Sequence, residues 1–175
     1  AIIGNQIYLT SSSSIVRKTE NFLSETFFNN QSDYKECEII DFKKLGKGLS
    51  LEGGDIFVLN HDIVLIGISE RTSKEAIDLI IPYLFEQAFE HVIAVDLPKE
   101  RAMMHLDTIF TQTSQNEGIL FNHPNYNIDQ LSVYFATNHS KRKKLTKHEF
   151  NFIDLLNDLE FNLISCGGND KNFQL

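Results

Sequence analysis

The chain has 175 residues, of which 42% are hydrophobic and 23% charged, with 16 Lys+Arg against 24 Asp+Glu. The length and composition are those of one globular domain, and a net charge of −8 argues against a general nucleic-acid or anionic-membrane binder. No apolar run approaches the roughly 20 residues that span a bilayer. Two cysteines cannot form a disulfide framework, so a reducing, cytoplasmic location is expected.

The first part of the chain predicts the order strand, strand, helix, strand. Ala1–Ile3 and Gln6–Leu9 are two short strands around a glycine turn, and the serines at 11–14 offer a helix N-cap. A further strand is predicted at Cys37–Phe42. The apolar residues that recur at helical spacing between them are Ile15, Phe22, Leu23 and Phe27.

The middle of the chain predicts the same order again. Ile56–Leu59 and Ile63–Ile68 are two strands, and Val92–Val95 closes the unit. Thr72 and Glu75 form a capping box before an amphipathic helix, and a proline inside the helix predicts a kink or a helix end nearby. The apolar stripe of this helix comprises Ala76, Ile77, Ile80, Ile81, Leu84, Phe85 and Ala88, with Pro82 among them.

The last part predicts the order a third time, with one additional strand. Thr108–Thr111 and Ile119–Phe121 are the paired strands, and Leu131–Phe135 is the extra one. A second capping box at Thr146–Glu149 begins a helix, and Leu163–Cys166 closes the unit.

The predicted fold is therefore α/β, with three repeated ββαβ units at approximately residues 1–42, 51–97 and 104–168. Because a strand–crossover–strand unit cannot bury its sheet alone, the units should pack around an axis or stack. A generic α/β sandwich is the alternative.

Two motifs place acidic groups and a histidine near strand entrances. Glu52 and Asp55 flank two glycines, which permit close backbone approach to a ligand; a glycine turn with solvated acids is the alternative. His105 and Asp107 share one face if their segment is extended, an arrangement suited to general acid–base work. A satisfied histidine beside a capping aspartate is the alternative there.

Other candidates are single residues. Arg71 could present its guanidinium to a carboxylate ligand, although a surface arginine without a role is the commoner outcome. Cys37 and Cys166 lie at predicted strands, where a buried and inert thiol is usual, yet the glycines after Cys166 would also suit a reactive thiol. No spacing predicts a zinc site or a nucleotide-binding loop, so neither a metal nor a cofactor is expected.

Five motifs together resemble the arginine deiminase family, in its order and spacing and over nearly the whole chain. They are Ile3-Gly4-Asn5, Leu51-Glu52-Gly53-Gly54-Asp55, Gly67-Ile68-Ser69-Glu70-Arg71-Thr72, Met104-His105-Leu106-Asp107-Thr108-Ile109-Phe110-Thr111 and Cys166-Gly167-Gly168. The resemblance implies about three blades of a five-bladed pseudo-symmetric α/β propeller. It also implies hydrolysis of L-arginine to L-citrulline and ammonia through a cysteine-linked covalent intermediate, without a cofactor.

The same resemblance implies roles for the acidic and basic candidates. His105 would be the general acid/base, with Glu52 beside it to favour the imidazolium. Asp107 would hold the substrate guanidinium through two oxygens, and Arg71 would bind the substrate carboxylate. Arg17 is a candidate second carboxylate clamp, although the family motif there is richer in arginine.

Asp55 belongs to the family motif and is expected to shape the substrate site. The family's other guanidinium-binding aspartate lies upstream of residue 1 and its nucleophilic cysteine lies downstream, while Cys166 matches a non-catalytic position. The chain alone is therefore expected to lack the nucleophile and to be inactive, as a central fragment, split-gene product or decayed paralogue.

Two other functions stay open. One is a non-catalytic guanidine-binding module, and the other is a different guanidino-modifying enzyme, either an amidinotransferase or a dimethylarginine hydrolase. An incomplete propeller would expose apolar surface, so self-association or binding to the remainder of the parent chain is expected.

Overall fold

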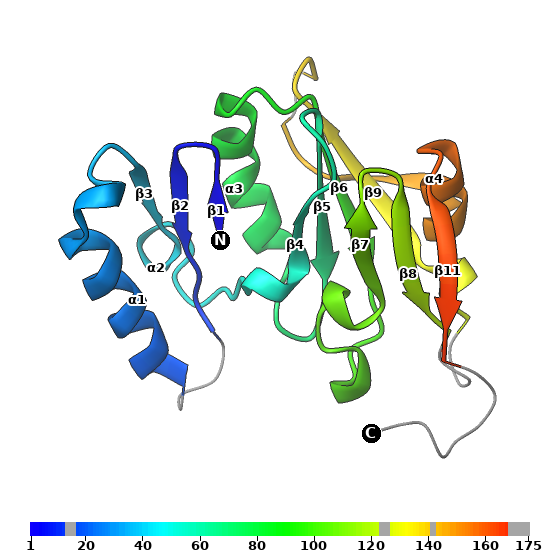
Figure 1. The fold of residues 1–175 in the computed structure, drawn as a ribbon, viewed down its shortest axis with the longest axis horizontal. Coiled ribbons are helices and arrows are strands. Elements are labelled where there is room, and N and C mark those ends of the chain that lie inside the picture. The colour runs from blue at the N-terminus through cyan, green and yellow to red at the C-terminus, as the bar shows by residue number, and fades with distance from the viewer. Residues whose placement is uncertain (13–16, 123–126, 141–142, 168–175) are drawn as a thin grey trace.

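The computed structural model of this chain describes residues 1–12, 17–122, 127–140 and 143–167. They form a mixed α/β fold, which confirms the predicted class. Three separate sheets lie in a row across the molecule (Figure 1).

The first sheet contains an antiparallel pair of strands and a third strand that returns parallel to the second. Its elements are β1 (Ile2–Ile3), β2 (Gln6–Leu9), α1 (Lys18–Asn30) and β3 (Glu38–Asp41), followed by the short helix α2 (Phe42–Leu45). The order is β1-β2-β3. Ser13, Ser14 and Ile15, which belong to the predicted start of α1, lie outside the described residues.

The second sheet has the same three-strand pattern, extended by a later hairpin. Its elements are β4 (Ile56–Val58), β5 (Ile63–Ile68), α3 (Lys74–Glu86), β6 (His91–Asp96), β9 (Ser132–Thr137) and β10 (Thr146–Asn151). The order is β10-β9-β6-β5-β4, and β5 and β6 are parallel. Every residue of β5 is buried, which explains its unbroken apolar sequence.

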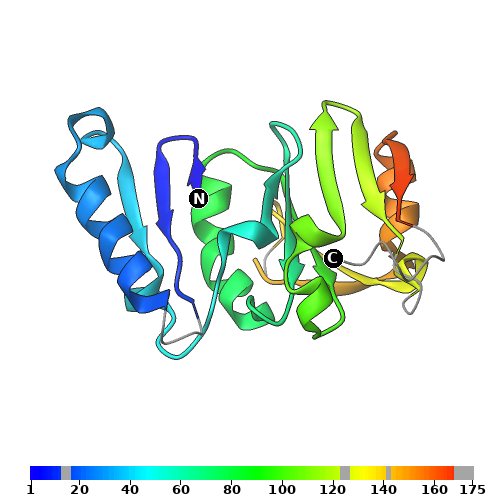
Figure 2. The same ribbon diagram turned by 60° about the horizontal axis from the view of Figure 1, so that its bottom comes forward.

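The third sheet again joins a hairpin to a parallel strand across a helix. Its elements are β7 (Phe110–Ser114), β8 (Glu117–Phe121), α4 (Phe152–Asp158) and β11 (Asn162–Cys166). The order is β11-β8-β7, with β8 and β11 parallel. In Figure 2, α1 lies at one end of the row of sheets and α4 with β11 lies at the other.

Both predicted capping boxes are wrong. Helix α3 is capped by Ser73, whose Oγ accepts the N–H of Ala76, while the hydroxyl of Thr72 faces the interior. The segment predicted to open the last helix pairs with β9 as strand β10, so α4 starts later and is capped by Asn151. In the second case strand pairing outweighs the local capping signal.

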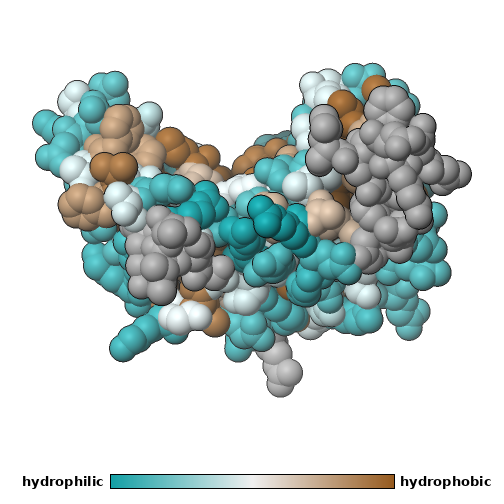
Figure 3. Space-filling model, turned by 90° about the horizontal axis from the view of Figure 1, so that it is seen from below, coloured by the Kyte–Doolittle hydropathy of each residue, from teal (hydrophilic) through white to brown (hydrophobic). Residues whose placement is uncertain are grey.

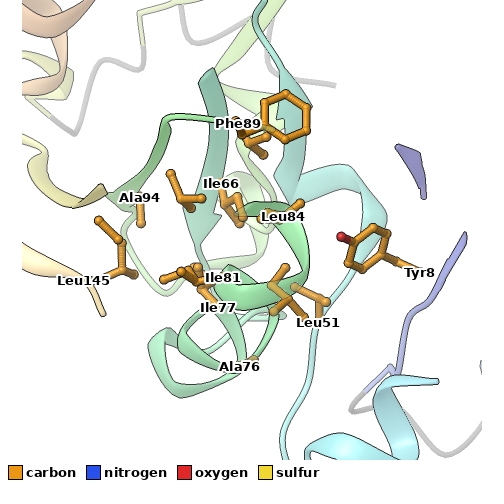
Figure 4. Close-up of a cluster of buried hydrophobic side chains, with 14 of the residues drawn as sticks. Tyr8, Leu51, Ile66, Ala76, Ile77, Ile81, Leu84, Phe89, Ala94 and Leu145 are labelled. Carbon is orange, nitrogen blue, oxygen red and sulfur yellow. The ribbon is translucent and has the colours of Figure 1, made fainter. Parts of the chain in front are cut away.

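Two hydrophobic clusters hold the sheets together. The first joins Tyr8 of the first sheet and Leu51 to the apolar face of α3, which includes Ile77 (Figure 4). The second lies between the second and third sheets, where the rings of Phe110 and Phe152 meet edge to face with centroids 5.9 Å apart. The central sheet is therefore covered by apolar side chains on both faces.

The helices differ sharply in burial. Six apolar residues of α3 are buried, and the helix continues past Pro82 to Glu86. Helix α1 leaves three large apolar side chains, Phe22, Leu23 and Phe27, 49–63% exposed. Within the described ranges no helix is both long enough and apolar enough to cross a membrane.

Candidate active site

Glu52 lies at the centre of the predicted site. It is 5% exposed and directly precedes a turn of 3-10 helix, η3 (Gly53–Asp55), that leads into β4. Arg17 Nη1 donates to Glu52 Oε2 at 2.5 Å, and His105 Nε2 lies 3.0 Å from the same oxygen. Arg71 Nη1 lies 3.6 Å from Oε1. Three basic side chains from distant segments thus converge on one carboxylate.

The surroundings of Glu52 favour its ionised form. Burial alone would raise the pKa of this carboxyl. A hydrogen bond from Ser12 and the charges of Arg17 and His105 outweigh burial, so the pKa of Glu52 lies below its ordinary value. Oε1 is buried and accepts no hydrogen bond from the described residues. One oxygen is therefore held by the protein while the other has capacity to accept a further donor.

His105 and Asp107 lie beside the glycine turn. His105 precedes a second 3-10 turn, η5 (Leu106–Thr108), so the segment is not extended as the same-face argument assumed. The pair is nevertheless brought together, with His105 Nδ1 3.9 Å from Asp107 Oδ1. A Cβ at Gly54 would lie 2.7 Å from Asp107 Oδ2 and 2.9 Å from His105 Nδ1. Only glycine leaves room for this approach.

Asp55 has a different environment from the other candidates. It is fully buried and accepts hydrogen bonds from Ser69, Thr72 and the N–H of Leu106, so it lies beneath the site. Burial raises the pKa of Asp55, against the opposing effect of these three hydrogen bonds and of the His105 charge. Asp55 does not line the cavity itself.

A cavity of about 280 Å³ opens at this point, near the small end of the range for small-molecule sites. Figure 3 looks onto the corresponding lower end of the molecule, where hydrophilic side chains gather at the centre of the face. The cavity is lined by Thr10, Ser12, Arg17, Asn21, Glu52, Gly53, Gly54, His105 and Asp107.

Sequence reasoning missed three of these lining residues, Thr10, Ser12 and Asn21. Thr10 directly follows β2, which runs parallel to β3, and Ser12 comes shortly after it. Ligand sites gather at the carboxyl ends of parallel strands, so this placement was the available signal. Asn21 gave no signal, because the packing of α1 brings it to the cavity.

The cysteines lie elsewhere. Cys37 is half-buried before β3, and Cys166 is exposed at the end of β11, so neither is a fully buried thiol. In the described part of the chain, no cysteine lines the cavity and no group of three or more histidine, cysteine or acidic residues could hold a metal.

The family model and the similar curated proteins agree on one family. The family model described as arginine deiminase matches residues 1–174. Similar curated proteins are arginine deiminases from Borreliella burgdorferi strain ZS7 (36% identical), Listeria monocytogenes serotype 4b strain CLIP80459 (31%) and Mycoplasma capricolum subsp. capricolum (34%). The alignments cover 96–97% of this chain and 42–43% of those proteins, so the chain spans less than half of their length.

A solved structure is similar in fold. It is a mutant of DDAH from Pseudomonas aeruginosa, complexed with citrulline, and it matches with a TM-score of 0.51 at 17% sequence identity. The match covers 91% of this chain and 62% of that chain. At this identity the likeness concerns the fold alone.

Proposed function

The chain belongs to the arginine deiminase family, and on that basis we propose that its parent protein hydrolyses L-arginine to L-citrulline and ammonia. The observation that carries the proposal is a polar cavity lined by Arg17, Glu52, His105 and Asp107. Arg71 does not line this cavity but lies next to it, 3.6 Å from Glu52. A cationic guanidinium with a carboxylate tail needs acidic groups at one end and basic groups at the other.

The proposed reaction has two steps and requires a cysteine thiolate from another part of the parent protein. The thiolate attacks the guanidinium carbon, a C–S bond forms, and a C–N bond breaks as the leaving nitrogen takes a proton from the His105 imidazolium. Neutral His105 then takes a proton from water, whose oxygen attacks the same carbon. The C–S bond breaks, the thiolate returns, the added oxygen loses its remaining proton to solvent, and citrulline leaves.

The acidic residues would prepare both steps. The contact between Glu52 Oε2 and His105 Nε2, at 3.0 Å, would hold the imidazole in place for the first step. Asp107, which lines the cavity and is about half exposed, would accept two guanidinium N–H groups.

The basic residues would hold the substrate carboxylate. Arg71 is the proposed main clamp, and Arg17 is the proposed second clamp. Arg17 now donates to Glu20 and Glu52, so we expect it to exchange the Glu52 contact when a substrate carboxylate enters. Asp55 is proposed to shape the site from below rather than to contact substrate.

We also propose that the three sheets are about three blades of a five-bladed propeller, within a partial catalytic domain that spans residues 1–175. The shared connectivity of hairpin, helix and parallel strand supports this proposal. Neither Cys37 nor Cys166 is proposed as the nucleophile, and the chain alone is proposed to be inactive. The cavity without a described cysteine supports that view.

Citrulline and ammonia formation by the full-length protein tests the function. The wild type should produce both from L-arginine, and Asp107→Asn should lower kcat/KM by about 100-fold or more, because charge-assisted hydrogen bonds to the guanidinium are lost. Asp158→Asn, an exposed change at the end of α4, is the matched control. Transfer of the amidino group to an amine, or turnover of dimethylarginine but not arginine, would favour the other guanidino-modifying enzymes.

The isolated chain separates the remaining alternatives. Calorimetric titration with arginine that shows tight binding without turnover would favour a guanidine-binding module. Citrulline formation by the isolated chain, abolished by Cys166→Ala, would contradict the assignment of Cys166 as non-catalytic.

A further inference from the structure

Asp55 joins three segments that carry separate functional groups. Its Oδ2 accepts hydrogen bonds from Ser69 Oγ at 2.7 Å and Thr72 Oγ1 at 2.6 Å, and its Oδ1 accepts the N–H of Leu106 at 2.9 Å. The first two donors follow β5, and Leu106 directly follows His105. A fully buried carboxylate with three donors is a costly group that is tolerated only when its hydrogen bonds are complete.

The hydroxyl groups of Ser69 and Thr72 also accept hydrogen bonds from backbone N–H groups of the site. Thr72 Oγ1 accepts the N–H of Glu52 at 3.0 Å. Ser69 Oγ accepts the N–H groups of Arg71 and Thr72, each at 3.0 Å. Since both lone pairs of Ser69 are occupied, its only proton is directed at Asp55, which acts as an acceptor.

We infer that Asp55 is the positioning residue of the site, and that it sets the mutual placement of Glu52, Arg71 and His105 without touching the substrate. The inference rests on the proposed function. The backbone N–H groups of Glu52 and Arg71 each donate to a hydroxyl that in turn donates to Asp55. His105 is next to Leu106, whose N–H donates to Asp55 directly. Catalytic groups must be held within a fraction of an ångström, so one buried hub can affect all three.

The packing around Asp55 is close at Gly67. A Cβ at Gly67 of β5 would lie 2.5 Å from Asp55 Oδ1 and 3.0 Å from the Cβ of Leu106. The glycine therefore permits the contact between the carboxylate and the segment that carries His105.

Asparagine at position 55 is the informative substitution, because it keeps the shape of the aspartate side chain and replaces one acceptor oxygen with an NH₂ donor. If its oxygen faces Ser69 and Thr72, its NH₂ group meets the N–H of Leu106. If it is flipped, the NH₂ group meets Ser69 Oγ, whose lone pairs are occupied. Either orientation places a donor against a donor or an occupied acceptor, so the segments must shift.

The test measures kcat, KM and folding of full-length variants. Asp55→Asn should lower kcat by about 100-fold with a smaller change in KM, while far-ultraviolet circular dichroism stays that of the wild type. Thr72→Val should also lower kcat, and Thr72→Ser, which keeps the hydroxyl, should recover most of the loss. Asp158→Asn, outside the network, should match the wild type.

Several outcomes would overturn the inference. The first is an Asp55→Asn variant that folds and has the kcat of the wild type. The second is that Thr72→Val and Thr72→Ser have the same kcat, and this result decides the question if Asp55→Asn does not fold. In both cases an active wild type leaves the proposed function standing. A full-length wild type that makes no citrulline overturns the proposed function, and the inference with it.

Discussion

At the scale of single residues, Glu52 has the greatest consequence, because its ionisation is linked to folding. The lowered pKa means that the folded protein stabilises the ionised form. Glu52 therefore contributes stability above the pKa of the unfolded carboxyl, near 4.5, and loses it as the pH falls through the lower pKa of the folded state.

We predict that Glu52→Gln lowers the free energy of unfolding by about 1–3 kcal/mol at neutral pH, because Arg17 and His105 lose a charged partner. The difference from the wild type should shrink as the pH falls below 4.5. Urea unfolding followed across this range measures both effects. Two stability curves that run parallel through the acidic range would contradict the prediction.

The acidic residues and the histidine of the candidate site could be predicted from the sequence, but the other polar residues that line the cavity could not. Glu52, His105 and Asp107 stood out because their motifs combine glycines with titratable groups at short spacing. Thr10 and Asn21 are ordinary polar residues, and only the packing of the first sheet and α1 against the glycine turn brings them to the cavity. Such contributions depend on long-range contacts that no local pattern encodes.

At the scale of elements, the strands were more predictable than the helix starts. Six consecutive residues that are apolar or glycine predict the buried strand β5. The strands that pair with it follow from the rules for hairpins and crossover connections. The capping motifs predicted the wrong helix starts because the hydroxyl groups of Thr72 and Thr146 make other hydrogen bonds. Thr72 bonds to Asp55, and Thr146 lies in β10, where its hydroxyl donates to the carbonyl of Phe135.

The cap of α4 provides a direct test at this scale. Asn151 Oδ1 accepts the N–H of Asp154 at 2.9 Å, so Asn151→Ala should lower the free energy of unfolding by about 1 kcal/mol. Thr146→Ala, at the cap that the sequence pattern predicted, should cost less, because its hydrogen bond is exposed. Urea denaturation midpoints compare the two variants. A larger loss from Thr146→Ala would contradict the observed start of the helix.

At the scale of the whole molecule, the three sheets are covered unequally. The central sheet is packed on both faces, whereas α1 at one end of the row presents Phe22, Leu23 and Phe27 to solvent. A cluster of three large apolar side chains on one helix is typical of a surface that another chain or segment covers. The same helix carries Asn21 and follows Arg17, so its placement also affects the cavity.

We predict that the isolated 175-residue chain self-associates through α1. Each of Phe22 and Leu23 exposes more than half of its surface, and association would remove that apolar area from water. Phe22→Ser combined with Leu23→Ser should shift the sedimentation coefficient toward that of the monomer, whereas Thr26→Ser, an exposed polar change on the same helix, should leave it unchanged. If the chain is part of the longer protein proposed above, joining it to the further segments should have the same effect as the double substitution, provided that those segments cover α1. A wild-type chain that sediments as a monomer at all concentrations would show that α1 needs no covering partner.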